Sequence, residues 1–315
     1  MHNVYDLIII GGGPAGLTAA LYACRARLKT VLVEKMLCGG QILVADTVEN
    51  FPGFPEGIKG PVLAEWIFKQ ASHFGLEVNT AEVTGIDKKG GGKESFTVHL
   101  RSGETLQALS LVIATGATWN LLDIPGEKKL TGRGVSYCAT CDGPLFKDKE
   151  VVVIGGGDTA LEDAIFLTKF AHKVTVVHRR DKLRATKILQ ERAFANKKIE
   201  FRFDSIPIEI KGTDRVESVE IKNVKTDESE AVKAEAVFVL VGMAPNSDAV
   251  KTIIKLDEKG CIVTDDDMRT SVEGIFACGD VRKKLLRQAI TAAGDGATAA
   301  FSAEHYIEGL RGAGV

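Results

Sequence analysis

The sequence predicts an α/β fold built on two βαβ units, because two segments of the chain repeat the same order of elements. In the first, the apolar run 5–10 leads into the turn GGGPAG, a helical pattern over 17–28 and the strand TVLVE. In the second, EVVVI leads into GGGDTA, a helical pattern over 161–171 and the strand KVTVV. A chain of 315 residues has room for about two domains. We therefore expect two domains of similar construction.

The remaining elements follow from apolar periodicity and turn residues. Between the two units we expect a helix over 62–74 and the strands VTGID, SFTVHL and LSLVIATG, where the KKGGGKE turn closes a hairpin that covers one sheet. After the second unit we expect the strands IEFRF, RVESVEIKNV and EAVFVLVG, a strand over 261–264, the segment IFACGD and a helix over 288–309.

The composition is that of a soluble globular protein, with 45% hydrophobic residues and 40 Lys plus Arg against 42 Asp plus Glu. A net charge of -2 supplies no field for nucleic acid or anionic lipid, so neither is expected as a partner. The start, MHNVYDLIIIGGGPAG, has no basic region or cleavage site, and the apolar runs are far shorter than the ~18 residues that span a bilayer. We therefore expect a cytoplasmic protein.

The first glycine motif is typical of a dinucleotide site. Gly11, Gly13 and Gly16 form G-x-G-x-x-G between a strand and a helix, which brings the backbone and a helix N-terminus to a pyrophosphate. Glu34 ends the next strand, 18 positions after Gly16, where a carboxylate would bind ribose hydroxyls. This context favours a dinucleotide with a free 2′-hydroxyl over a merely tight turn.

The second motif has Gly155, Gly157 and Ala160 at the same spacing, but His178 stands where the carboxylate would be. The arginines that follow it are Arg179, Arg180 and Arg184. Because a guanidinium fork matches a 2′-phosphate, the pattern predicts NADP rather than NAD, although a solvated basic turn is the alternative. We expect His178 to orient or pack rather than to catalyse.

Two dinucleotide sites in one chain suggest that a nicotinamide passes hydride to a flavin, so the first site is expected to hold FAD. Near the end of the chain, IFACGD places Gly279 and Asp280 directly after a strand. A backbone amide and a carboxylate there could bind the ribityl and phosphate part of the flavin.

Cys138 and Cys141 form a C-x-x-C pair, followed by Asp142, in a polar loop between the two units. The spacing favours a redox-active dithiol over a zinc site or a buried pair, and no metal site is expected. Asp142 is a candidate proton donor or acceptor for the thiols, or alternatively a helix cap. The other cysteines are expected to be inert: Cys24, Cys38, Cys261 and Cys278.

The order of motifs over nearly the whole chain resembles that of the low-molecular-weight thioredoxin reductases, a group of FAD- and NADPH-dependent pyridine nucleotide-disulphide oxidoreductases. The motifs are GGGPAG, GGQ, VENFPGF, ATGA, CATCDG, GGGDTA, HRRDKLRA, ACGD and RQAITAAGDG. The resemblance implies two Rossmann-like domains of the three-layer ββα type. An FAD domain of residues 1–117 and 247–315 would be interrupted by an NADPH domain of residues 118–246, which carries the cysteine pair.

The resemblance also implies the site residues. The flavin contacts would be Gly13, Ala15, Glu34, Gln41, Asn50, Thr115, Gly116, Asp280, Arg287, Gln288 and Ala289. The NADPH contacts would be Gly157, Asp158, Thr159, His178, Arg179, Arg180 and Arg184. The sequence departs from the family pattern in the basic RKKLL before RQA and in the glycines at 90–92, which we expect to affect partner contacts and the hairpin.

The implied activity is thioredoxin-disulfide reduction by a homodimer. Hydride passes from NADPH to FAD, then to the Cys138–Cys141 disulfide, and then by thiol-disulfide exchange to thioredoxin or a similar protein. We expect Cys138 to attack the partner and Cys141 to lie nearer the flavin. A rotation of one domain is implied, with hinges at 115–118 and 242–246. The alternatives are a reductase or oxidase of another dithiol on the same scaffold, a non-enzymatic NADP-binding redox sensor and a zinc-stabilised binding module.

Overall fold

The computed structural model describes residues 4–45, 47–89 and 95–312. The chain divides into two compact units, one formed by Met1–Thr118 with Ala244–Val315 and the other by Trp119–Met243. The second unit is therefore inserted into the first. The expected domain boundaries, after residues 117 and 246, lie within three residues of these divisions.

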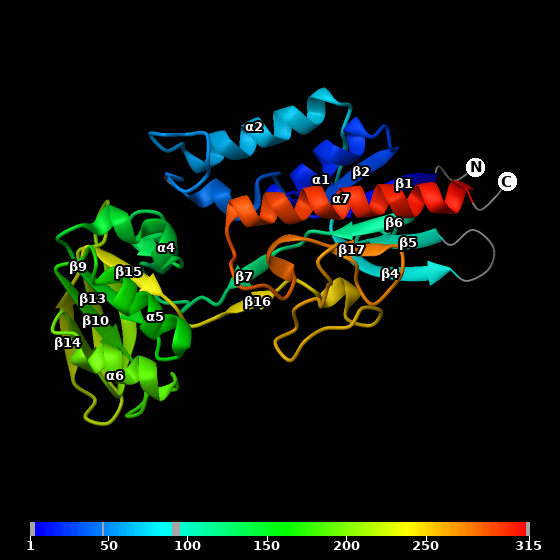
Figure 1. The fold of residues 1–315 in the computed structure, drawn as a ribbon. Helices are drawn as coiled ribbons and strands as arrows, with labels where there is room; N and C mark the ends of the chain where they lie inside the picture. Colours follow the sequence, from blue (N-terminus) through cyan, green and yellow to red (C-terminus); the bar gives the residue numbers. More distant parts are fainter. Residues whose placement is uncertain (1–3, 46, 90–94, 313–315) are drawn as a thin grey trace. The chain divides into compact units, whose positions relative to one another are not determined.

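The first unit is built on a seven-stranded sheet (Figure 1). Its parallel strands run in the order β3, β2, β1 and β6, and β17 also pairs with β6. Their bounds are Glu77–Thr80, Thr30–Glu34, Val4–Ile10, Thr105–Ile113 and Ile275–Ala277. The antiparallel strands β5 and β4, Ser95–Leu100 and Val83–Lys89, continue the sheet from β6.

Alternation along β1 explains why both faces of this sheet are covered. Leu7 and Ile9 pack with residues of α1 and α7, whereas Ile8 and Ile10 pack with Phe96 and other residues of the β4–β5 hairpin. The hairpin therefore covers one face, as predicted, while remaining hydrogen-bonded to β6. Its predicted turn at 90–94 lies outside the described residues.

The helices of the first unit are α1 (Pro14–Arg25), α2 (Gly60–His73) and α7 (Ala289–Gly312). Its 3-10 turns are η1 (Gly40–Val44), η3 (Asp248–Val250) and η4 (Gly279–Val281).

The second unit repeats this layering. Its parallel sheet has the order β11, β10, β9, β15 and β8, with bounds Ile199–Arg202, Lys173–Val177, Glu150–Ile154, Ala236–Val239 and Val135–Ser136. Val151 and Val153 of β9 face the helical layer, and Val152 and Ile154 pack on the three-stranded antiparallel sheet. That sheet consists of β12 (Ser205–Lys211), β13 (Ser218–Asn223) and β14 (Ser229–Lys233). The helices are α3 (Glu127–Leu130), α4 (Ala139–Asp142), α5 (Asp158–Leu167) and α6 (Lys187–Ala195), and the 3-10 turn is η2 (Gly143–Phe146).

One predicted strand is wrong. Residues 261–264 contribute only isolated bridges at Ile262, which pairs with Leu256 and with Arg282. The backbone N–H of Cys261 instead donates to the Asp257 carboxylate at 2.8 Å, which closes a turn. The segment is apolar because Ile262 packs into the core beside β1, not because it belongs to a sheet ladder.

The chain passes between the units through β7 (Ala117–Trp119) and β16 (Met243–Pro245), which pair with each other. Next to this ribbon, Thr115 Oγ1 donates to the Asn246 carbonyl at 2.6 Å, and Asn246 Nδ2 donates to the Thr115 carbonyl at 2.9 Å. The two segments expected to act as hinges are thus tied together along their length.

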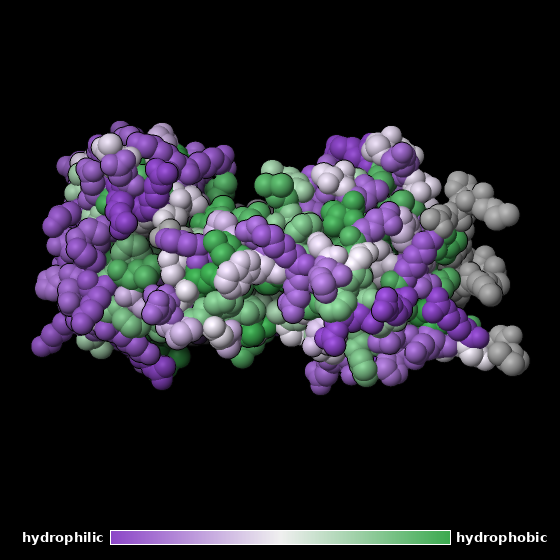
Figure 2. Space-filling view, turned by 90° about the horizontal axis from the view of Figure 1, so that it is seen from above, coloured by the Kyte–Doolittle hydropathy of each residue, from purple (hydrophilic) through white to green (hydrophobic). Residues whose placement is uncertain are grey.

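Hydrophilic residues cover much of the visible face of the Trp119–Met243 unit, and hydrophobic residues emerge there in patches (Figure 2). No helix among the described residues is long and apolar enough to cross a membrane.

Candidate functional site

The first glycine turn joins β1 to α1, as its motif predicts. A Cβ atom on Gly16 would lie 1.8 Å from the Gly11 carbonyl oxygen, so only glycine lets the helix start this close to the strand. The turn therefore presents backbone N–H groups and the N-terminus of a 12-residue helix at the carboxyl edge of the sheet.

Glu34 ends β2 beside this turn. One carboxylate oxygen accepts a hydrogen bond from the Gly12 N–H at 2.7 Å, and the other accepts from the Met36 N–H at 3.0 Å. These bonds hold the carboxylate at the edge of the glycine turn, at the place where the dinucleotide motif requires an acceptor for ribose hydroxyls.

Other predicted flavin residues meet at the same edge although they are far apart in sequence. Asn50 Nδ2 donates to Gln288 Oε1 at 2.9 Å, and Gln288 directly precedes α7, which begins at Ala289. Gln41 Nε2 donates to the carbonyl of Ala117, which follows β6. Parallel strands bring their carboxyl ends together, which explains this gathering.

Asp280 lies in η4, directly after β17. Its Oδ1 atom is buried and has no hydrogen-bond partner within the described residues. Burial raises the pKa of the Asp280 carboxyl above its usual value, whereas the charges of Lys284 and Arg287 oppose the rise. A buried acceptor without a partner costs free energy unless a ligand donates to it, so Asp280 marks a polar binding site.

A largely solvent-shielded ion network supports this region. Asp295 of α7 accepts from Arg282 Nη1 at 3.0 Å, from Lys284 Nζ at 2.7 Å and from the Gly279 N–H at 3.0 Å. The three charged side chains are only 8–12% exposed. We expect the RKKLL segment to affect partner contacts, yet two of its three cations, Arg282 and Lys284, pair with Asp295, and only Lys283 is exposed.

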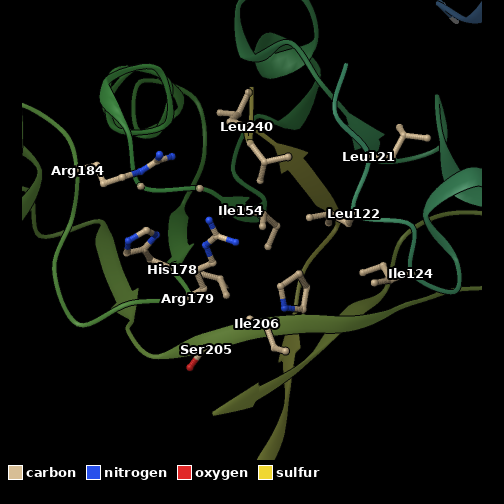
Figure 3. Close-up of a pocket in the computed structure, with 15 residues that line it drawn as sticks. Leu121, Leu122, Ile124, Ile154, His178, Arg179, Arg184, Ser205, Ile206 and Leu240 are labelled. Atoms are coloured by element: carbon tan, nitrogen blue, oxygen red, sulfur yellow. The ribbon is translucent and has the colours of Figure 1, made fainter. Parts of the chain in front are cut away.

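The second glycine turn borders a pocket of about 370 Å³ within the Trp119–Met243 unit (Figure 3). Small-molecule sites commonly measure about 300–1,000 Å³. Arg179, Arg184 and His178 lie on one side, and leucine and isoleucine side chains lie on the other. The N–H of Arg184 donates to the Gly156 carbonyl at 2.7 Å, which brings this arginine to the glycine turn.

His178 packs against the turn. A Cβ atom on Gly156 would come within 2.3 Å of His178 Nδ1, and His178 Nε2 donates to the Lys182 carbonyl at 3.1 Å. Burial lowers the pKa of His178, and the neighbouring arginines lower it further. The ring is therefore neutral at pH 7 and holds the segment that carries the arginines.

Several predicted NADPH residues lie outside the lining of this pocket. Arg180 is exposed, and Gly157 and Thr159 stand at the start of α5. The carboxylate of Asp158 accepts from the Thr186 N–H at 2.6 Å and thus fixes the loop that follows the arginines.

Cys138 and Cys141 are joined by a disulfide, with their Cα atoms 5.3 Å apart. Cys138 precedes the short helix α4, and the Cys141 N–H points to Cys138 Sγ at 3.3 Å. A thiolate on Cys138 would gain from this N–H group. Asp142 is the last residue of α4 and directly precedes the 3-10 turn η2. Within the described residues 143–146 of that turn, no backbone N–H donates a capping hydrogen bond to the Asp142 side chain.

The remaining cysteines are free thiols in unreactive surroundings. Cys24, Cys261 and Cys278 are buried, and Cys38 is half-buried. Burial raises the pKa of each, for Cys38 to about 11 with a contribution from Glu34. A thiol that stays protonated is a poor nucleophile, in agreement with the inert role predicted for these cysteines.

Sequence reasoning missed Asp163 of α5. The helix packs against α4, which carries the redox cysteines. Burial raises the pKa of Asp163 to about 6, with a further contribution from Glu162. The only sequence signal was a carboxylate on a helix whose apolar residues pack into the core.

The model of the pyridine nucleotide-disulphide oxidoreductase family matches residues 5–296. The chain belongs to this family. Membership in the pyridine nucleotide-disulphide oxidoreductases implies that the chain binds a flavin and a pyridine nucleotide, which agrees with two glycine turns at the carboxyl edges of two parallel sheets.

Relatives within the pyridine nucleotide-disulphide oxidoreductases match over almost the full length. The chain is 49% identical over 316 residues to a thioredoxin reductase of Peptoclostridium acidaminophilum, covering 98% of each chain. It is 48% identical over 311 residues to that of Bacillus subtilis (strain 168), covering 98% of this chain and 97% of the relative. A crystal structure of thioredoxin reductase from Streptococcus pyogenes MGAS5005 is 48% identical, covers 98% of this chain and 100% of its own, and has a TM-score of 0.93. The predicted resemblance and fold class are confirmed.

Proposed function

We infer that the protein is a thioredoxin-disulfide reductase that uses NADPH and FAD. The observation that carries the inference is the Cys138–Cys141 disulfide, which lies in the same compact unit as a nucleotide pocket lined by two arginines. Full-length relatives at 48–49% identity are named thioredoxin reductases, which supports thioredoxin as the partner.

The first unit fits FAD because it offers a glycine turn, a positioned carboxylate on Glu34 and a buried acceptor on Asp280 without a partner in the described chain. When bound, FAD supplies the two-electron chemistry that connects a nicotinamide to a disulfide. The residues that would hold it are Gly11, Gly13, Ala15, Gly16, Glu34, Gln41, Asn50, Thr115, Gly116, Gly279, Asp280, Arg287, Gln288 and Ala289.

The pocket of the second unit fits the adenosine end of NADPH. Arg179 and Arg184 offer guanidinium groups for a 2′-phosphate, and the apolar side, with Leu122 and Ile206, suits an aromatic base. The N-terminus of α5, with Gly155, Gly157 and Thr159, would bind the pyrophosphate.

Cofactor preference tests the arginines individually. We expect Arg179→Ala and Arg184→Ala each to reduce the preference of kcat/KM for NADPH over NADH by roughly one to two decades, because a charged hydrogen bond is worth about 1.5–3 kcal/mol. Arg180→Ala, which removes an exposed arginine outside the pocket lining, is the matched control and should have a smaller effect. An unchanged preference in both pocket variants would contradict the 2′-phosphate assignment.

The dithiol transfers the electrons to the partner. Two electrons and two protons convert the Cys138–Cys141 disulfide into two thiols. The Cys138 thiolate, favoured by the Cys141 N–H, attacks one sulfur of the partner disulfide and releases the other as a thiolate. Cys141 then attacks the mixed disulfide, which frees the reduced partner and restores the original bond. Asp142, next to Cys141, would hold or deliver a proton in these exchanges.

The activity is tested by the oxidation of NADPH in the presence of oxidised Bacillus subtilis thioredoxin. We expect turnover that stops when thioredoxin is omitted. A flavin that NADPH reduces without turnover on thioredoxin would favour another dithiol partner. A colourless protein with no turnover would favour a redox sensor, and stoichiometric zinc without colour would favour a binding module.

We also propose that the protein is a homodimer in the cytoplasm. The homodimer rests on the resemblance to thioredoxin reductases, and the location is supported by four free thiols, which suit a reducing compartment. Analytical ultracentrifugation at several concentrations tests the first, and fractionation of the native cells tests the second.

A further inference from the structure

Two donors converge on the sulfur of Cys138. The N–H of Cys141 points to Cys138 Sγ at 3.3 Å, and the Thr140 hydroxyl oxygen also lies 3.3 Å from that sulfur. A sulfur in a disulfide carries no hydrogen, so the Thr140 hydroxyl is the donor of this bond. Two neutral donors, one from the backbone and one from a side chain, therefore serve the same sulfur.

The position of Cys138 is fixed by hydrogen bonds that do not involve its sulfur. Ser136 Oγ accepts from the Cys138 N–H at 3.1 Å and donates to the Cys138 carbonyl at 3.3 Å. The preceding residue, Tyr137, donates its hydroxyl to the buried carboxylate of Glu127 at 3.0 Å. Loss of the Thr140 hydroxyl should therefore leave the backbone of Cys138 in place.

The elements packed around the pair offer acids but no cation. The helix α4 packs against α5 (Figure 1) and against the turn η2. These three elements, whose residues are all described, contain no lysine, arginine or histidine. The first cation after the pair in the sequence is Lys147, which follows η2 and is exposed. The acids of the three elements are Asp142, Asp158, Glu162 and Asp163. Because carboxylates disfavour a neighbouring thiolate, these elements can stabilise a thiolate on Cys138 only through neutral donors.

We propose that Thr140 is a catalytic residue for disulfide exchange, whose hydroxyl donates to Cys138 Sγ and makes Cys138 the thiolate of the reduced pair. A thiolate accepts a hydrogen bond more strongly than a neutral disulfide sulfur, so the bond favours the charged form. Two electrons from NADPH and one proton from water convert the disulfide into a Cys141 thiol and a Cys138 thiolate. The thiolate then attacks one sulfur of the partner disulfide, forms the mixed disulfide and releases the other partner sulfur as a thiolate.

The inference rests on the proposed function, and its test needs neither NADPH nor thioredoxin. The holoenzyme is reduced with dithiothreitol, freed of it without oxygen, and alkylated with iodoacetamide as a function of pH. Mass spectrometry of the peptides gives the label on Cys138 and on Cys141 separately. Thr140→Val removes the hydroxyl and keeps the size of the side chain, so access of the reagent to the sulfur is unchanged.

In Thr140→Val we expect the apparent pKa of the Cys138 thiol to rise by about half a unit to one unit. The shift is limited because Thr140 is exposed, so water replaces part of the lost bond. At a pH below that pKa, alkylation of Cys138 should be about two- to threefold slower, because the smaller thiolate fraction is offset in part by higher nucleophilicity. The ratio of label on Cys138 to label on Cys141 should fall.

Thr140→Ser is the matched control, since it keeps a hydroxyl at the same position. It should retain the wild-type thiol pKa and label ratio, whereas Thr140→Ala, a second variant without the hydroxyl, should behave as Thr140→Val does. An unchanged Cys138 pKa and label ratio in Thr140→Val and Thr140→Ala, or an equal change in Thr140→Ser, would overturn the proposal, whether or not thioredoxin is reduced.

Discussion

Cys141→Ser is expected to abolish disulfide reductase turnover and to leave reduction of the flavin by NADPH intact. Cys138 then has no partner with which to close the disulfide, so the electrons remain on the flavin. The measurement is an anaerobic titration with NADPH, followed through the flavin absorbance. The wild type should take up about two electron pairs, one for the flavin and one for the disulfide, and the variant about one.

Cys261→Ser is the matched control for this titration, because Cys261 is a buried free thiol that belongs to the other compact unit. It should take up as many electron pairs as the wild type. Uptake of two pairs by Cys141→Ser would show that the second acceptor is not the Cys138–Cys141 pair. Flavin that is bleached by dithionite but not by NADPH would indicate another electron donor.

Asp295→Asn is expected to lower the free energy of unfolding by about 3 kcal/mol, because it leaves Arg282 and Lys284, whose side chains are only 8–12% exposed, without a counter-charge. The loss should also weaken flavin binding, since Asp295 accepts from the Gly279 N–H next to Asp280. Urea unfolding gives the stability, and flavin fluorescence on dilution gives the dissociation constant.

Glu308→Gln provides the comparison, since Glu308 is exposed on the same helix and its substitution removes the same charge. It should change the stability by less than about 0.5 kcal/mol. If both variants unfold at the same urea concentration, the Asp295 network does not stabilise the flavin unit. A stability loss without weaker flavin binding would mean that the network supports the fold but not the Asp280 site.

Most of the site was predictable where local chemistry decides the structure. The glycine turns, the helices that follow them and the C-x-x-C pair depend on residues a few positions apart. The strand predicted at 261–264 failed because alternation of apolar residues reports burial, not pairing. Ile262 is buried beside β1, yet it makes only isolated bridges.

The sequence by itself determined two βαβ units, the order of the nucleotide motifs and the redox pair, because short-range sterics and periodicity specify them. Only the tertiary structure decided that Asp295 pairs with two cations of the RKKLL segment and that Arg179 and Arg184, rather than Arg180, line the pocket. These pairings join residues on different elements. The packing of helices and sheets and the free-energy cost of burying an unpaired charge decide which residues pair. No local sequence pattern encodes either of these.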